Sequence, residues 1–152
     1  MSKKNDTIFQ KCMLEAEKSN LLFKHGCVAT YGGKIIASGC NTHKSYSNDC
    51  FIKDQCSCHA EINVLRKIYN NYKHKDRKLK KVMKNTTLYV SRCSSQGKST
   101  NSAPCMKCLK TIKSFNIKKI IFVLNDEYHI YKTSDYFTEH KTFGDKNLDL
   151  IK

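Results

Sequence analysis

The stretch His59-Ala60-Glu61, followed 43 residues after Glu61 by Pro104-Cys105-Met106-Lys107-Cys108, decides how the fold of this chain is interpreted. Either half alone is weak, because His-x-Glu and Cys-x-x-Cys both occur often by chance. Their order is informative, since each half opens a segment with helical periodicity and a strand-like segment lies between them. The two halves therefore predict two helix starts that contribute polar side chains to one site.

One imidazole and two thiolates form a ligand set that suits zinc: His59, Cys105 and Cys108. A catalytic zinc takes three protein ligands and keeps a fourth position open. Two cysteines separated by two residues at a helix start can point to one ion, and the positive end of the helix dipole favours their thiolate forms. Zinc lowers the pKa of a bound water toward about 7. Glu61, in the same helical turn as His59, is placed to accept and return that water's proton.

A structural zinc site is an alternative for Cys105 and Cys108. It would be closed by a fourth protein ligand, for which the candidates are Cys56, Cys58 and Cys93. A structural site needs neither Glu61 nor Pro104, so we favour the catalytic arrangement. A second zinc is a further hypothesis, with a nearby histidine and one of three cysteines as ligands: Cys50, Cys56 or Cys58.

Three segments carry apolar residues at spacings of three and four, which predicts amphipathic helices. They run from Asp6 to about Ser19, from near Cys58 to Tyr72, and from Pro104 to about Phe115. Proline suits a helix N-terminus because it lacks an N–H that would find no partner there. Residues 134–152 are expected to form a short helix and a frayed end.

Strands are predicted where the period changes. Residues 27–31 and 34–38 flank Gly32-Gly33, a pair that tolerates positive φ and favours a two-residue hairpin. Residues 87–91 are rich in β formers, and the continuous apolar run 120–124 suits a central strand. The short connection after residue 124 fits only a hairpin, so a last strand at 128–131 should be antiparallel to its predecessor.

Length and cysteine content limit the class of protein. With 152 residues and 39% apolar residues, the chain should form a single domain over residues 1–152. No run of about 18 apolar residues is present, and the N-terminus lacks the apolar core of a secretory signal, so we expect a soluble cytoplasmic protein. Nine cysteines at irregular spacings argue for reduced thiols instead of a secreted disulfide framework.

The chain is strongly basic, with a formal net charge of +15. Residues 66–84 hold nine Lys and Arg against one acid, Asp76. One interpretation is a nucleic-acid or phosphate partner. The other is A+T-rich codon usage, because lysine dominates over arginine, with residues 66–84 forming a solvated helix end and loop. The sequence leaves both interpretations open.

Together, the two motifs match the H-x-E…P-C-x-x-C signature of zinc deaminases, so the chain resembles the cytidine deaminase-like superfamily from about His25 to Tyr131. This resemblance implies a three-layer α/β/α sandwich with a mixed five-stranded sheet. It also implies Zn²⁺ as the cofactor, held by His59, Cys105 and Cys108, with Glu61 as the proton carrier.

The resemblance implies substrate contacts as well. Asn41 matches the substrate-binding asparagine of the family, and the main chain at Ala60 and Ala103 matches positions that contact the base. Many relatives have Ser or Glu in place of Ala103, so main-chain contacts remain there but a side chain is missing. Relatives often assemble, which implies a homo-oligomer. For His25 and His43 we expect structural roles.

Three functions follow as hypotheses. The first is hydrolytic deamination at C4 of a cytosine nucleoside or nucleotide such as cytidine, CMP or dCMP, by an enzyme of nucleotide metabolism. The second is deamination of cytosine or adenine within RNA or single-stranded DNA, motivated by the net charge of +15. The third is a zinc-stabilised binding module without catalysis. Neither of the last two is excluded by the residues alone.

Overall fold

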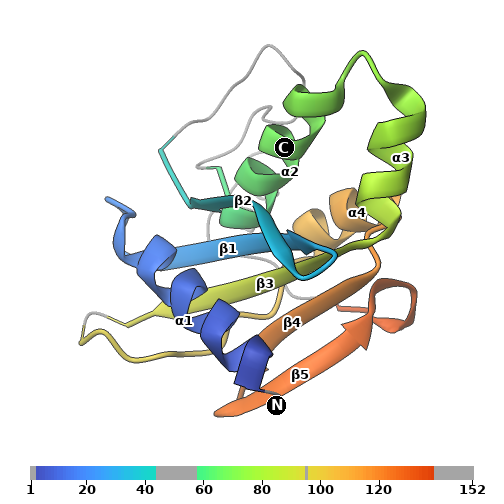
Figure 1. The fold of residues 1–152 in the computed structure, drawn as a ribbon. Coiled ribbons are helices and arrows are strands. Elements are labelled where there is room, and N and C mark those ends of the chain that lie inside the picture. Colours follow the sequence, from blue (N-terminus) through green and yellow to red (C-terminus); the bar gives the residue numbers. More distant parts are fainter. Residues whose placement is uncertain (1–2, 44–57, 95, 139–152) are drawn as a thin grey trace, which may run out of the picture.

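A computed structural model describes residues 3–43, 58–94 and 96–138 of the chain (Figure 1). Five strands form one sheet in the order β2-β1-β3-β4-β5, with helices on both faces. β3 and β4 are parallel, and every other neighbouring pair is antiparallel. The prediction of an α/β/α sandwich with a mixed five-stranded sheet is therefore confirmed.

The first hairpin joins β1 (Lys24–Tyr31) to β2 (Lys34–Cys40). Its two turn residues, Gly32 and Gly33, have φ values of 59° and 80°, a conformation that strains any residue with a Cβ. Two consecutive positive φ values give the twist that a two-residue β-hairpin requires. The Gly-Gly pair therefore closes a two-residue hairpin, as the sequence predicts.

The remaining strands are β3 (Thr86–Cys93), β4 (Lys119–Leu124) and β5 (Glu127–Lys132). The parallel pair β3 and β4 needs a crossover, which α4 (Met106–Ser114) provides. β5 follows β4 after a two-residue turn and pairs with it antiparallel. The predicted orientation of the last strand is thus confirmed.

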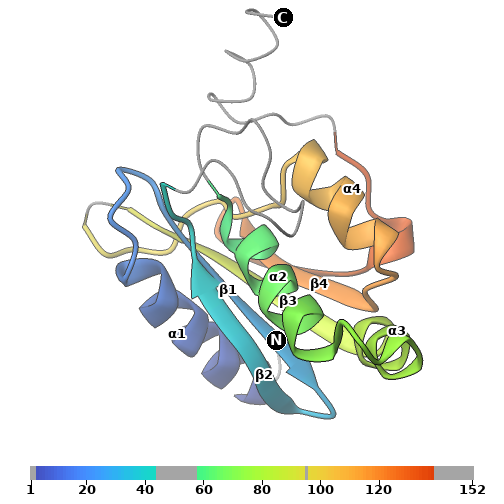
Figure 2. The ribbon, with the colours of Figure 1, turned by 90° about the horizontal axis from the view of Figure 1, so that it is seen from above.

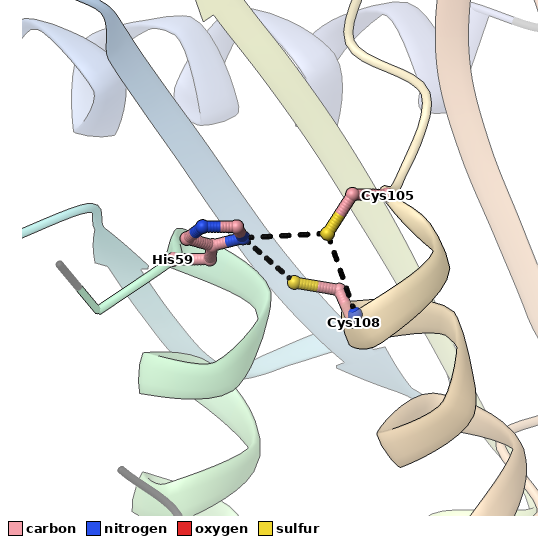
Figure 3. A group of neighbouring side chains, drawn as sticks. All are labelled: His59, Cys105 and Cys108. Carbon is pink, nitrogen blue, oxygen red and sulfur yellow. Dashed lines mark hydrogen bonds between the residues drawn. The ribbon is translucent and has the colours of Figure 1, made fainter. Parts of the chain in front are cut away.

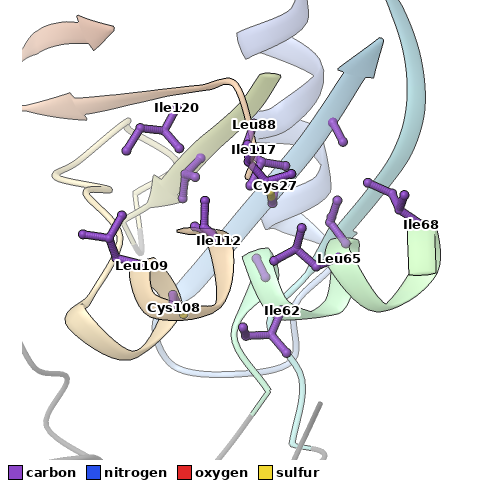
Figure 4. Packing of buried hydrophobic residues seen from close by; sticks show 14 of the residues in the cluster. Cys27, Ile62, Leu65, Ile68, Leu88, Cys108, Leu109, Ile112, Ile117 and Ile120 are labelled. Carbon is purple, nitrogen blue, oxygen red and sulfur yellow. The ribbon is translucent and has the colours of Figure 1, made fainter. Parts of the chain in front are cut away.

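The two faces of the sheet are covered differently. α1 (Lys3–Glu17) lies on one face, whereas α2 (Ala60–Tyr72) and α4 lie on the other (Figure 2). The larger apolar cluster fills the space between the sheet and these two helices, with Leu65, Ile112 and Phe122 fully buried (Figure 4). α1 approaches its face closely because Gly26 has no side chain: a Cβ there would collide with the α1 backbone at Cys12 and Ala16.

One helix was not predicted. Residues 76–84 form α3 (Asp76–Lys84), where the sequence suggested only a solvated helix end and loop. Leu79 packs against the larger apolar cluster, while Val82 and Met83 are buried within it. Only these three apolar residues mark the inner face, and the surrounding lysines and arginine conceal the period.

The N-termini of α2 and α4 lie at the same end of the sheet, beside the carboxyl end of β3 (Figure 2). Ligands of open α/β sheets commonly bind at the carboxyl ends of the strands. We call this side of the molecule the metal end. At the C-terminus of the described chain only a short 3₁₀ helix, Thr133–Asp135, is found, and the expectation for residues 139–152 lies outside the described residues. None of the helices in the described ranges combines the length and apolar character needed to cross a bilayer.

Candidate active site

The two halves of the motif meet at the metal end. His59 is the residue immediately before α2, and Cys105 is the residue immediately before α4 (Figure 3). The His59 Nδ1 atom lies 3.0 Å from the Cys108 sulfur and 3.5 Å from the Cys105 sulfur. The three potential ligand atoms all lie within 4.8 Å of one another. Two helix starts that are 46 positions apart in sequence therefore converge on one point.

The donor set and its spacing fit zinc. With Zn–S bonds of about 2.3 Å and a Zn–N bond of about 2.0 Å, tetrahedral angles separate two sulfurs by roughly 3.8 Å and a nitrogen from a sulfur by roughly 3.5 Å. The two observed nitrogen–sulfur distances are 3.0 and 3.5 Å, so small rotations of the side chains satisfy this geometry. Cys105 and Cys108 are buried and His59 is half-buried, which shields the site from bulk water.

The local electrostatics favour a thiolate in this cluster. A hydrogen bond with Cys108, helped by the nearby His59 ring, lowers the pKa of the Cys105 thiol to about 4. The same hydrogen bond, together with burial, raises the pKa of Cys108. The backbone N–H of Cys108 also donates to the Cys105 sulfur at 3.4 Å. The pair therefore holds one negative charge at the start of α4, where the helix dipole stabilises it.

Glu61 lies in the first turn of α2 and is only 4% exposed. Burial raises the pKa of its carboxyl group, although the neighbouring His59 opposes that shift. The carboxyl group is close enough to Cys108 to affect its protonation. A buried carboxyl group with a raised pKa beside a candidate metal cluster is well suited to take up and release a proton.

The described residues offer the cluster no fourth protein ligand. Among them, His59, Cys105 and Cys108 form the one group of His, Cys, Asp and Glu side chains compact enough for a metal. The Cys58 sulfur instead lies 3.5 Å from the His59 carbonyl oxygen. Cys93 is buried in β3. Of the other proposed ligands, Cys50 and Cys56 lie outside the described residues.

The predicted substrate-binding residues lie on the segments that lead into the cluster or beside the loop before β1. Ala60 is the buried first residue of α2, and Ala103 is a half-buried residue of the loop that leads to Cys105. The Asn41 amide accepts a hydrogen bond from the His25 N–H at 2.9 Å and donates one to the Phe23 carbonyl at 2.6 Å. Each end of that amide retains capacity for one further hydrogen bond, so Asn41 also remains able to contact a ligand.

The sequence did not indicate the role of the loop before β1. His25 lies beside Arg92 across the β1–β3 pair, and Arg92 stacks over Phe23 with its guanidinium carbon 4.9 Å from the ring centre. Burial, with the charges of Arg92 and His59, lowers the pKa of His25 to about 4. His25 is therefore an uncharged residue next to the cluster. Arg92 reaches the same place only because β1 and β3, which are far apart in sequence, pair with each other.

Ser102 is a second residue that the sequence did not indicate. Its hydroxyl donates to the Val90 carbonyl at 2.7 Å and accepts from the Val123 N–H at 2.9 Å. The hydroxyl thus ties the loop before Pro104 to both β3 and β4. A serine in a polar loop carries no local signal for such a role, because its partners lie 12 and 21 residues away.

The fold and the cluster together define a zinc-binding deaminase-like protein. The family model for the cytidine and deoxycytidylate deaminase zinc-binding region matches residues 2–124, and the chain belongs to that family. No curated protein matches the sequence.

Solved structures share the fold. The dCMP deaminase from the cyanophage S-TIM5 in its apo form aligns with a TM-score of 0.53 and 21% identity, covering 79% of this chain and 82% of that one. Cytidine deaminase from Burkholderia pseudomallei aligns with a TM-score of 0.59 and 15% identity, covering 89% of this chain and 95% of that one. At these identities the likeness concerns the fold.

Proposed function

We propose that the protein is a zinc-dependent hydrolytic deaminase that converts a cytosine nucleoside or nucleotide, of the cytidine, CMP or dCMP type, into its uracil product. The observation that carries this proposal is a cluster of one imidazole and two sulfurs beside a buried carboxylate, Glu61. His59, Cys105 and Cys108 hold the zinc, which when bound supplies a Lewis acid that makes water nucleophilic near neutral pH.

Glu61 moves the protons of the reaction. It accepts a proton from the attacking water and gives it to the ring nitrogen next to C4. A second transfer protonates the amino group, after which the C4–N bond breaks and ammonia leaves. One water is consumed, and its oxygen becomes the carbonyl oxygen at C4. The raised pKa of Glu61 suits both directions of transfer, because the carboxyl group must gain and lose a proton within one cycle.

The residues near the cluster support a pyrimidine nucleoside or nucleotide as the substrate. Ala60 follows His59 directly and Ala103 precedes Cys105 by two residues, so their main-chain groups are candidates for the donors and acceptors on the edge of a cytosine ring. The Asn41 amide oxygen can accept one more hydrogen bond and its NH₂ group can donate one more, and either could contact a sugar hydroxyl. The Arg92 guanidinium, at the metal end of β3, is a candidate partner for a 5′-phosphate.

A substrate panel tests the proposal. Protein of measured zinc content is incubated with cytidine, deoxycytidine, CMP, dCMP and adenosine, and products are identified by chromatography together with ammonia release. The cyanophage enzyme was solved with dCMP and dUMP, which makes this pair the first to test. Uracil product from at least one cytosine compound is expected. Zinc-loaded protein that releases no ammonia from any of the four cytosine compounds would refute the proposal.

A further inference from the structure

The basic residues of the protein concentrate at the end of the sheet opposite the metal. We define the basic end as residues 73–84, which include α3, together with Lys113, Lys118, Lys119 and Lys132. Residues 73–84 hold seven Lys and Arg against one acid, Asp76. α3 follows the C-terminal end of α2, and the other four lysines lie at the C-terminal end of α4, the start of β4 and the end of β5 (Figures 1 and 2).

The charges on α3 are solvated and without ion pairs. Within the described part of the chain, none of the Lys and Arg side chains of residues 73–84 forms a salt bridge, whereas Lys18 pairs with Glu15 at 2.8 Å. Arg77, Lys78 and Lys81 line an open hollow of about 300 Å³. Tyr31 and Tyr72 form its floor with Ile36, and the Lys78 ammonium lies 5.6 Å from the centre of the Tyr72 ring. This hollow thus combines cations with aromatic rings.

A second basic hollow lies on the other side of the β3 start. It measures about 500 Å³ and is lined by Lys113, Lys118, Lys119 and Lys132, with the short polar side chains of Asn116 and Ser134 between them. The two hollows are joined through Thr86: its hydroxyl donates to the Val82 carbonyl of α3, and its own carbonyl accepts from the Lys118 N–H at 3.0 Å. The basic end is therefore one continuous structural unit, built by α3, the C-terminal end of α4, the start of β4 and the end of β5.

The acids of the described chain are distributed differently. Glu15 and Glu17 lie in the last turn of α1, and Asp126 and Glu127 lie in the β4–β5 turn. Both positions belong to the metal end, so the lysines at that end have acids near them. The basic end contains two acids, since Asp76 begins α3 and Asp135 follows Lys132, but its eleven Lys and Arg outnumber them.

From this local excess of cations without ion pairs, gathered around two hollows, we infer that the basic end is a docking surface for the phosphate backbone of a polynucleotide, separate from the metal site. Lysines dominate it, which suits phosphate contacts that carry no base specificity, whereas base readout usually relies on arginine. The tyrosines of the first hollow offer stacking faces for unpaired bases.

The docking surface lies too far from the metal to be part of the substrate pocket. α2 runs from His59 at the metal end to its last residue, Tyr72, beside the first hollow. Its 13 residues correspond to about 20 Å at 1.5 Å per residue. The surface would thus hold the protein on a polynucleotide while leaving the metal end accessible, and it is independent of the proposed deaminase activity.

Binding is measured by fluorescence anisotropy with labelled 30-residue single-stranded RNA, single-stranded DNA and duplex DNA, between 50 and 300 mM salt. The wild-type chain is compared with the triple variant Arg77→Gln, Lys78→Gln, Lys81→Gln and with the double variant Lys118→Gln, Lys132→Gln, which alters the second hollow. A matched control removes three exposed lysines elsewhere: Lys11→Gln, Lys18→Gln, Lys98→Gln. Circular dichroism and zinc content are recorded for all four proteins.

Wild-type binding should weaken steeply with salt, because phosphate contacts release counterions. The α3 triple should bind at least tenfold more weakly at 100 mM salt, and its log–log salt slope on a single strand should be smaller by about 2, from three lost contacts at about 0.7 each. The double variant should also weaken binding, and the control should change affinity less than twofold. Glu61→Gln should bind as the wild type does, whatever its activity.

Three outcomes would overturn the inference. The first is a control triple that weakens binding as much as the α3 triple, since net charge alone would then be responsible. The second is an absence of salt-dependent binding to any of the three nucleic acids. The third is binding to polyglutamate as tight as binding to the nucleic acids, which would indicate an acidic protein as the partner. Preference among the three nucleic acids identifies the source of the phosphates.

Discussion

The metal end and the basic end of the sheet are built from opposite ends of the same elements, yet they differ in almost every physical property. At the metal end, helix N-termini converge, and the functional groups are buried: Cys105 and Cys108 are 3% and 1% exposed. At the basic end, α3 packs against α2, the C-terminal end of α4 leads to the start of β4, and the charged groups are solvated. The comparison shows that one sandwich separates a precise buried site from a diffuse charged surface.

Helix polarity contributes to this division. The positive dipole ends of α2 and α4 at the metal end stabilise thiolates and a carboxylate. The last turn of α3 carries Lys81 and Lys84, where the negative dipole end favours cations. At these three helix termini the charge of the side chains is the one that the dipole favours. Four predictions test whether the two ends act independently.

The largest effect is expected from removing a metal ligand. Cys108→Ala takes away one of three ligands, so zinc content should fall from about one per chain to near zero and activity to background. Zinc is measured by elemental analysis, and activity by ammonia release. Cys12→Ala is the matched control, because Cys12 is equally buried but belongs to α1, on the other face of the sheet. A Cys108 variant that keeps both zinc and turnover would exclude the proposed ligand set.

Glu61→Gln should lower kcat by about 10²- to 10⁴-fold, the usual contribution of a positioned general acid–base group. The amide keeps the shape of the side chain but cannot shuttle a proton, so zinc content and thermal unfolding should stay close to wild type. Steady-state kinetics on the best cytosine substrate provide the measurement, with exposed Glu17→Gln as the control. Unchanged turnover would favour a binding module over an enzyme.

These two predictions concern residues that the sequence identifies by itself. The order of the motifs and the helical periods around Ile62 and Ile112 are local signals. They were sufficient to predict that His59 and Cys105 lie at two helix starts that share one site. Arg92 and Ser102 carry no such signal. Their positions follow from strand pairing over long sequence separations, which no local pattern encodes.

α3 escaped prediction for a different reason. Its inner face consists of only Leu79, Val82 and Met83, whereas residues 73–84 hold seven Lys and Arg, and the run of charge resembles a solvated loop. The helix depends on packing against the larger apolar cluster, because an isolated segment of nine residues is too short to be stable in water. Tertiary contacts thus decide a structure that local propensity leaves open.

The third prediction concerns Asn41, at the metal end. Asn41→Ala would leave the His25 N–H and the Phe23 carbonyl without their side-chain partner, at a cost of about 1–3 kcal/mol in the free energy of unfolding. Urea unfolding measures this loss, and exposed Asn20→Ala serves as the control. Affinity for polynucleotides should be unaffected, since the change lies at the metal end. If stability is unchanged while KM rises, Asn41 acts through the substrate and not through the loop.

The smallest effect is expected from the same α3 triple when stability is measured instead of binding. Arg77 and Lys81 are four residues apart, and Lys78 and Lys81 three apart, so like charges face one another along the helix surface. Neutralising them should raise the free energy of unfolding by about 0.5 kcal/mol at low salt, since each repulsive pair costs roughly 0.2–0.5 kcal/mol. The gain should fade at high salt, because exposed charges are screened there.

The control triple breaks the Lys18–Glu15 pair and should give no gain. An α3 triple that is less stable than wild type at every salt concentration would mean that these side chains support the fold, and the basic end could then not be interpreted as a surface kept for a partner.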